Sequence, residues 1–165
     1  MLEDMSPDAF RNLVHWFYRD YLDPNTYHDR DTLVETWIAA DRLLMTVCKN
    51  RVMDKLREVC QIVGVNAKII KVAEPLGYSA ESSLLMYLTD QLAFDCVELD
   101  HEDLTDGDVS QWTPQTHLLV TTKITALARR WRRSQTSNQP APTDPLGSEL
   151  CYYHDHIESE DCYAK

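Results

Sequence analysis

Residues 6–18 read SPDAFRNLVHWFY, and this stretch carries the clearest indication of the fold. Ser6 supplies a capping hydroxyl, Pro7 suits the first helical position, and Asp8 places an acid in the first turn. Apolar side chains then recur at the helical spacing i, i+3, i+4 and i+7, as Phe10, Leu13, Val14 and Phe17. The stretch therefore predicts an amphipathic helix with one apolar stripe.

The same periodicity continues along the chain. Further helices are predicted from Asp31, over 52–63 and 69–73, after a Ser79 cap, and after Thr113. The last of these is expected to bury Leu118, Ile124, Leu127 and Trp131. No strand pattern or internal repeat is evident. The predicted fold class is therefore all-α, a bundle of about five to six short helices with a disordered C-terminal tail.

Composition suggests how these helices are grouped. Residues 1–97 form a helical region, and 98–112 an acidic loop with six acids between 98 and 108. Residues 113–133 form a C-terminal helix, and 134–165 a flexible tail that begins with a Ser-, Gln-, Pro- and Thr-rich stretch.

The overall charge restricts the kind of partner. The net charge is −11, which argues against affinity for nucleic acid or anionic membrane, because both are bound by clustered Lys and Arg. There is no secretory signal or membrane-spanning run, and the five cysteines are an odd count. An intracellular location, nuclear or cytoplasmic, is expected.

Four arginines are the exception to this acidity. They crowd the end of the helix after Thr113, as Arg129, Arg130, Arg132 and Arg133. Cations there suit the helix dipole, and they could also bind an acidic partner, including the chain's own acidic stretch.

Glycine usage argues against several enzyme classes. The four glycines, at positions 64, 77, 107 and 147, are too far apart for a GxGxxG loop, a Walker A loop or a GxSxG elbow. The histidines are not spaced to form a catalytic arrangement with Ser, Cys or Asp. The chain is therefore expected not to be an enzyme.

Three stretches together resemble the fungal BTB/POZ family. Residues 10–18 (FRNLVHWFY), with Leu22 after them, are similar to the family's F-x3-V-x-W-L-Y-T-G-x-L helix and turn. Residues 37–45 (WIAADRLLM) and 50–56 (NRVMDKL) are similar to its Y-x-x-A-D-K-L and N-x-x-M-D-x-L helices. The resemblance implies a protein–protein interaction module, an adaptor or a transcription-associated protein. Its partner would be another BTB protein or a ubiquitin-ligase scaffold.

The chain also departs from the family. Arg19 and Asp20 stand where the family has Thr-Gly, so the turn is expected to be built differently. The sheet-forming half of a BTB domain does not precede Met1, which would make the chain a truncated gene product or a remnant. The apolar stripe of Phe10, Leu13, Val14 and Phe17 is then either a partner-binding surface or, if later helices cover it, ordinary core.

The C-terminal end contains a set of metal-ligand residue types. Cys151, His154, His156 and Cys162 supply two thiols and two imidazoles, which suit tetrahedral zinc. The alternative is an acidic tail in which these residues are incidental.

Overall fold

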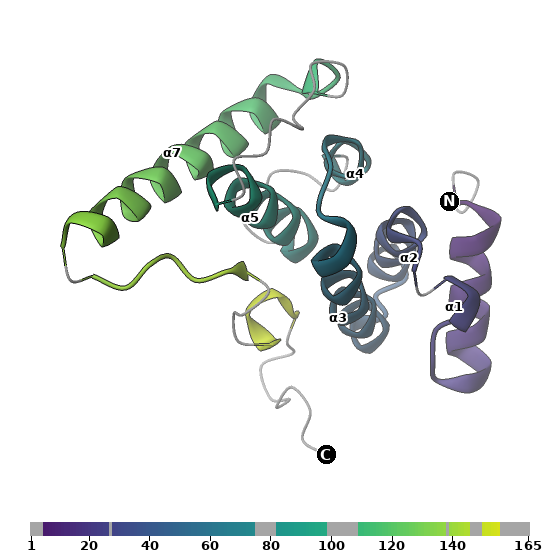
Figure 1. Ribbon diagram of the computed structural model, residues 1–165. Coiled ribbons are helices and arrows are strands. Elements are labelled where there is room, and N and C mark those ends of the chain that lie inside the picture. Colours follow the sequence, from purple (N-terminus) through teal and green to yellow (C-terminus); the bar gives the residue numbers. More distant parts are fainter. Residues whose placement is uncertain are drawn as a thin grey trace. The chain divides into compact units, whose positions relative to one another are not determined.

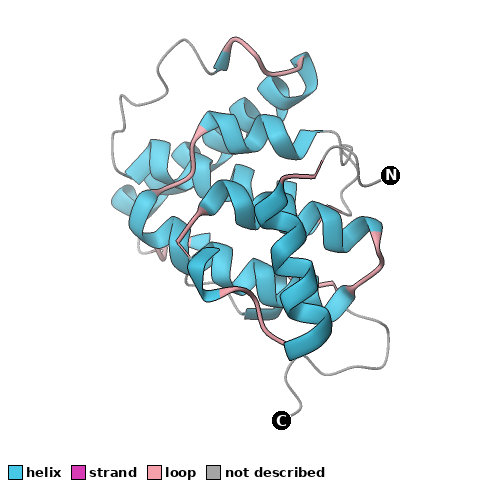
Figure 2. Cartoon of the chain, turned by 90° about the vertical axis from the view of Figure 1, so that its right-hand side faces the viewer, coloured by secondary structure: helices cyan, strands magenta, loops and turns pink. Residues whose placement is uncertain are grey.

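The computed structural model describes residues 5–26, 28–74, 82–98, 109–137, 139–145 and 150–155. All regular structure within these ranges is helical, which confirms the all-α prediction (Figure 2). Figure 1 shows the helices α1 (Pro7–Arg19), α2 (Arg30–Arg42), α3 (Thr46–Val63), α4 (Ala67–Ala73), α5 (Ser83–Glu98) and α7 (Pro114–Thr136), with the short 3-10 helices η1 (Pro24–Thr26) and η4 (Leu150–Tyr153).

The chain packs as two compact units. The first consists of residues 1–63 together with 149–165, and the second of residues 64–148. They join after Val63, at Gly64, whose φ of +68° lies in the left-handed region that favours glycine. The C-terminal segment thus belongs to the same unit as α1, α2 and α3, which was not anticipated from the sequence.

Helix α1 begins and ends as its sequence requires. The Ser6 hydroxyl accepts a hydrogen bond from the backbone N–H of Ala9, as the predicted cap demands. At the other end Asp20 adopts φ +58° and donates its N–H to the carbonyl of Trp16. Aspartate tolerates this left-handed conformation better than most residues, so this turn forms without a glycine.

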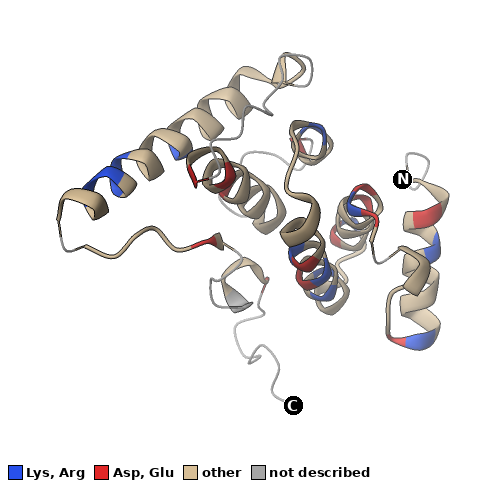
Figure 3. Cartoon of the chain, viewed as in Figure 1, with Lys and Arg blue, Asp and Glu red and all other residues tan. Residues whose placement is uncertain are grey.

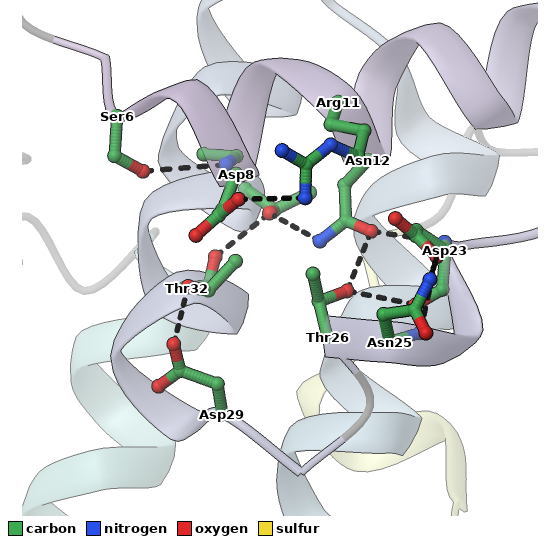
Figure 4. A network of polar contacts seen from close by, with 11 residues as sticks. Ser6, Asp8, Arg11, Asn12, Asp23, Asn25, Thr26, Asp29 and Thr32 are labelled. Carbon is green, nitrogen blue, oxygen red and sulfur yellow. Dashed lines mark hydrogen bonds and ion pairs between the residues drawn. The ribbon is translucent and has the colours of Figure 1, made fainter.

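A buried amide joins α1 to α2 and to the loop between them (Figure 4). Asn12 is fully buried, and its Nδ2 donates to Thr36 Oγ1 on α2 at 3.0 Å. Its Oδ1 accepts from the backbone N–H of Asp23 at 3.0 Å and from the Thr26 hydroxyl at 2.8 Å. One side chain therefore fixes three segments.

Apolar side chains of α2 and α3 form much of the first unit's core. The buried side chains include Leu33, Val34 and Trp37 from α2, and Val52, Met53 and Leu56 from α3. Cys48 and Cys60 are also buried, as expected of small core residues. Burial raises the pKa of the Cys48 thiol to about 12, so this thiol stays protonated and unreactive at neutral pH.

Helix α5 is the centre of the second unit. It buries Leu84, Leu85, Leu88, Leu92 and Phe94. The helix begins at Ser83, and the Ser82 hydroxyl accepts from the N–H of Leu85. Ser79, the expected cap, lies outside the described residues.

The expected apolar face of α7 is less buried than predicted. Leu118 is 70% exposed and Ile124, Leu127 and Trp131 are half-buried, whereas Thr116 and Val120 are buried. Residues two positions apart on a helix lie about 200° from one another, so Leu118 faces away from the side that contacts α5. Val120 and the hydroxyl of Thr116, rather than Leu118, make the buried contacts near the start of the helix.

Glu74 fixes the start of α7 within this unit. Its Oε1 accepts from the backbone N–H of Thr113 at 2.8 Å and from the Thr116 hydroxyl, and its Oε2 pairs with Lys71 Nζ at 2.6 Å. Burial alone would raise the pKa of Glu74, but the hydrogen bonds from Lys71, Thr116 and Thr113 outweigh it and lower the pKa. The carboxylate is therefore held in its charged form.

We predict that Asn12→Ala lowers the free energy of unfolding of the first unit by about 2 kcal/mol or more, because buried polar partners lose their hydrogen bonds. Gln61→Ala is the matched control, since Gln61 is an exposed amide on α3 and its loss should change stability by less than about 0.5 kcal/mol. Urea denaturation followed by circular dichroism measures both. Equal stabilities of the two variants would contradict the role given to Asn12.

We predict that Glu74→Gln makes the stability of the second unit less dependent on acid pH. A carboxylate whose folded-state pKa is lowered stabilises the fold above its unfolded pKa, and that stability is lost as the pH falls through the folded-state value. Urea midpoints of wild type should therefore fall between about pH 6 and pH 3 more steeply than those of Glu74→Gln. Glu98→Gln, at the exposed end of α5, should keep the wild-type slope.

Candidate functional site

The C-terminal half of α1 presents aromatic side chains to solvent. Phe17 is 67% exposed and Tyr18 85% exposed, while Trp16 is half-buried. With Met45, which lies in the turn between α2 and α3, these residues line an open hollow of about 500 Å³. We call Trp16, Phe17, Tyr18 and Met45 the aromatic patch.

Charges lie at the rim of this patch. Arg19 and Asp20 line the same hollow, directly after the aromatic residues. The Arg19 guanidinium donates to the hydroxyl of Tyr21 at 3.3 Å. The hollow is thus lined by aromatic and thioether side chains together with one cation and one anion, and its surface is of mixed polarity. Surfaces that bind another protein have a similar mixture.

Unusual backbone conformations occur at both helix ends that border the patch. Among the described residues other than glycine, positive φ angles occur at Asp20 and at Leu44, which has φ +57°. The Leu44 N–H donates to Asp41 O and the Met45 N–H to Ala40 O, both at 2.9 Å, which is the hydrogen-bond pattern of a Schellman motif. Glycine usually occupies the left-handed position of that motif, so leucine is strained there.

This strained leucine is also exposed. Leu44 is 88% exposed, so packing against this unit does not explain an apolar side chain at that position. Backbone strain that brings no internal packing is typical of functional sites.

The expected partner-binding residues do not share one environment. Phe10 and Phe17 are 51% and 67% exposed, and Val14 is half-buried. Leu13 is 2% exposed and belongs to the core, so it is not accessible to a partner. The helical spacing placed all four on one stripe, but the rest of the unit covers the stripe unevenly. Leu44 lies in a turn outside that stripe, and the periodicity of α1 could not identify it.

The expected zinc ligands are only partly described. The His154 side chain is buried, and its Nε2 lies 2.8 Å from Asp54 Oδ1 on α3. The side chain of Cys151, and residues His156 and Cys162, lie outside the described part. Among the residues that are described, no group of three or more His, Cys, Asp or Glu could hold a metal ion. The zinc site stays a prediction.

The basic cluster lies on an exposed part of α7. Arg129, Arg130, Arg132 and Arg133 are all exposed, and α7 carries no acid beside them (Figure 3). Most of the acidic stretch, residues 99–108, lies outside the described residues. Binding of an acidic partner by this cluster stays a prediction.

Comparison with known proteins adds no relative. No family model matches the chain, and no curated protein or solved structure matches it either. Within the described ranges, no helix is both long enough and apolar enough to cross a bilayer. The resemblance to BTB/POZ proteins therefore stays a prediction.

We predict opposite outcomes for two substitutions in the stripe of α1. Phe17→Asp should leave the free energy of unfolding within about 0.5 kcal/mol of wild type, because the side chain is exposed. It should also reduce self-association in size-exclusion chromatography, because it breaks an exposed apolar surface. Leu13→Asp should lower stability by more than about 3 kcal/mol, because it buries an unpaired charge. Loss of helical circular dichroism in Phe17→Asp would show that the aromatic patch is part of the core.

Proposed function

We propose that the protein is a non-enzymatic protein–protein interaction module that binds its partner through the aromatic patch. The observation that carries this proposal is the exposure of Phe17 and Tyr18 beside the half-buried Trp16, around one open hollow. Exposed aromatic side chains gathered around a hollow are typical of surfaces that bind another protein.

The residue types of the patch suit a strong binding site. Aromatic side chains account for much of the energy of protein interfaces, because they bury a large area and lose few rotamers. Covering Phe17 fully would contribute about 1.5–3 kcal/mol, and Tyr18 is even more exposed. Fixed backbone at both flanking helix ends keeps the side chains in place before binding, which lowers the entropic cost of association.

The partner that fits is a protein segment with apolar side chains for the hollow and polar groups for its rim. Arg19 would face an acid or carbonyl group of the partner, and Asp20 a donor. The resemblance to BTB/POZ proteins suggests the class of partner: another BTB protein or a ubiquitin-ligase scaffold. An adaptor or transcription-associated role is consistent with such a partner.

The proposal is tested by binding of the full chain to purified BTB proteins and ubiquitin-ligase scaffolds, measured by isothermal titration calorimetry. Phe17→Asp should weaken binding at least about tenfold, the equivalent of about 1.4 kcal/mol. Ile62→Asp is the matched control, because it introduces the same charge at an exposed apolar residue of α3, 81% exposed, that does not line the hollow. Equal binding by both variants would contradict the proposal.

Leu44→Gly adds a test that separates function from folding. Glycine relieves the left-handed strain and should leave stability unchanged or raise it by up to about 1 kcal/mol. The same variant should bind the partner more weakly, because it removes an exposed apolar side chain next to Met45 of the aromatic patch. A variant that is at least as stable but binds less well cannot be explained by misfolding.

A further inference from the structure

The C-terminal segment of the first unit lies on α3 through a set of polar contacts. Asn50 donates from Nδ2 to the carbonyl of Asp155 at 2.9 Å and accepts the N–H of Asp155 on its Oδ1 at 3.0 Å. One side-chain amide therefore pairs with both main-chain groups of a single residue. Such a pair recognises the main chain itself, here directly after η4 (Leu150–Tyr153).

Charged residues of α3 contact three consecutive side chains of this segment. Asp54 Oδ1 lies 2.8 Å from His154 Nε2, and Lys49 Nζ forms an ion pair with the Asp155 carboxylate. The guanidinium of Arg57 lies over the ring of Tyr153, 5.7 Å from its centroid. We call Lys49, Asn50, Asp54 and Arg57 the α3 clamp. These residues follow a spacing that places them on one side of a helix, and Figure 3 shows charges of both signs along α3.

These contacts bury two side chains of the segment and hold a lysine of α3 in ion pairs. The His154 side chain has no exposed surface, and Tyr153 is 2% exposed. Lys49 Nζ also pairs with Asp41 at 2.6 Å. Burial of Lys49 acts to lower its pKa, but the hydrogen bonds with Asp155 and Asp41 outweigh burial and raise it. The ammonium is thus held charged between two carboxylates, one of which the segment supplies.

We infer that the α3 clamp is a peptide-binding site, occupied in this structure by the chain's own Tyr153-His154-Asp155. Its external ligand is a segment of another protein with the sequence aromatic–His–acid. The seated segment specifies that chemistry: a ring for Arg57, an imidazole for Asp54 and a carboxylate for Lys49.

Tyr153 and His154 are buried as deeply as core residues, but the segment is also held by hydrogen bonds and ion pairs that a ligand with the same groups can replace. The segment is joined to α3 by contacts between residues about a hundred positions apart in the chain. Most of these contacts are hydrogen bonds and ion pairs, each of which contributes only about 0.5–3 kcal/mol net. Occupancy therefore depends on the high effective concentration that covalent attachment provides. An external segment with the same chemistry competes once it is abundant, or once the chain's own segment is displaced.

This site is separate from the aromatic patch. None of the α3 clamp residues lines the hollow beside α1. Failure of one proposal leaves the other unaffected.

The experiment uses the full chain and a fluorescein-labelled peptide with the sequence of residues 149–156, in which serine replaces the cysteine. His154→Ala/Asp155→Ala in the chain weakens the attached ligand and should vacate the clamp. Fluorescence anisotropy should then show the peptide binding this variant at least about tenfold more tightly than wild type. When Asn50→Ala is added to this variant, binding of the peptide should be lost. The control adds Gln61→Ala instead, and because Gln61 is an exposed amide of α3 outside the clamp, binding of the peptide should not change. A peptide with alanine for its own His154 and Asp155 should not bind.

Three results would overturn the inference. If His154→Ala/Asp155→Ala loses its helical circular dichroism, the segment is a structural part of the unit. If the variant is folded and does not bind the peptide, the α3 clamp is not a binding site. If wild type is a dimer by light scattering and the variant a monomer, the segment is exchanged between two copies rather than replaced by another protein.

Discussion

The buried amide of Asn12 is the interaction on which the first unit depends. A polar side chain with no exposed surface is tolerated only when its donors and acceptors are paired, and here the partners come from α2 and from the loop around η1. The hydrogen bonds are directional, so they fix the rotation of α1 about its own axis, which apolar contacts alone would leave less well defined. Which residues of α1 face the core and which face solvent follows from that rotation.

The extent of the covering layer explains why the aromatic patch is exposed. Leu13 and Phe17 lie on the same side of α1, but Phe17 is one turn further along the helix, where the rest of the unit no longer covers that side. The left-handed residues Asp20 and Leu44 then end α1 and α2 sharply, and the turn from α2 to α3 is short. A surface that would otherwise rearrange around its aromatic rings is thereby held in one conformation.

Local signals in the sequence predicted much of the fold. The helix starts at Ser6 and Thr113 each depend on residues within one helical turn, and the structure has both. The missed features depend on residues far apart in the chain. Nothing near Asn12 indicates Thr36 as its partner, and nothing near His154 indicates Asp54. Periodicity also assigns a residue to a face of its helix without showing how much of that face a neighbour covers, which is why Leu13 and Phe17 were grouped together.

The order of the two units along the chain has a consequence for protein synthesis. The first unit begins at the N-terminus but is completed by residues that follow the whole of the second unit. A ribosome adds roughly 5–20 residues per second, so α3 is exposed for several seconds before Tyr153, His154 and Asp155 have been made. During that interval the nascent chain offers an empty α3 clamp to whatever the cell contains, and a ligand that arrives then competes with no attached segment. Recruitment of a partner at the ribosome would thus be governed by translation speed through residues 64–148.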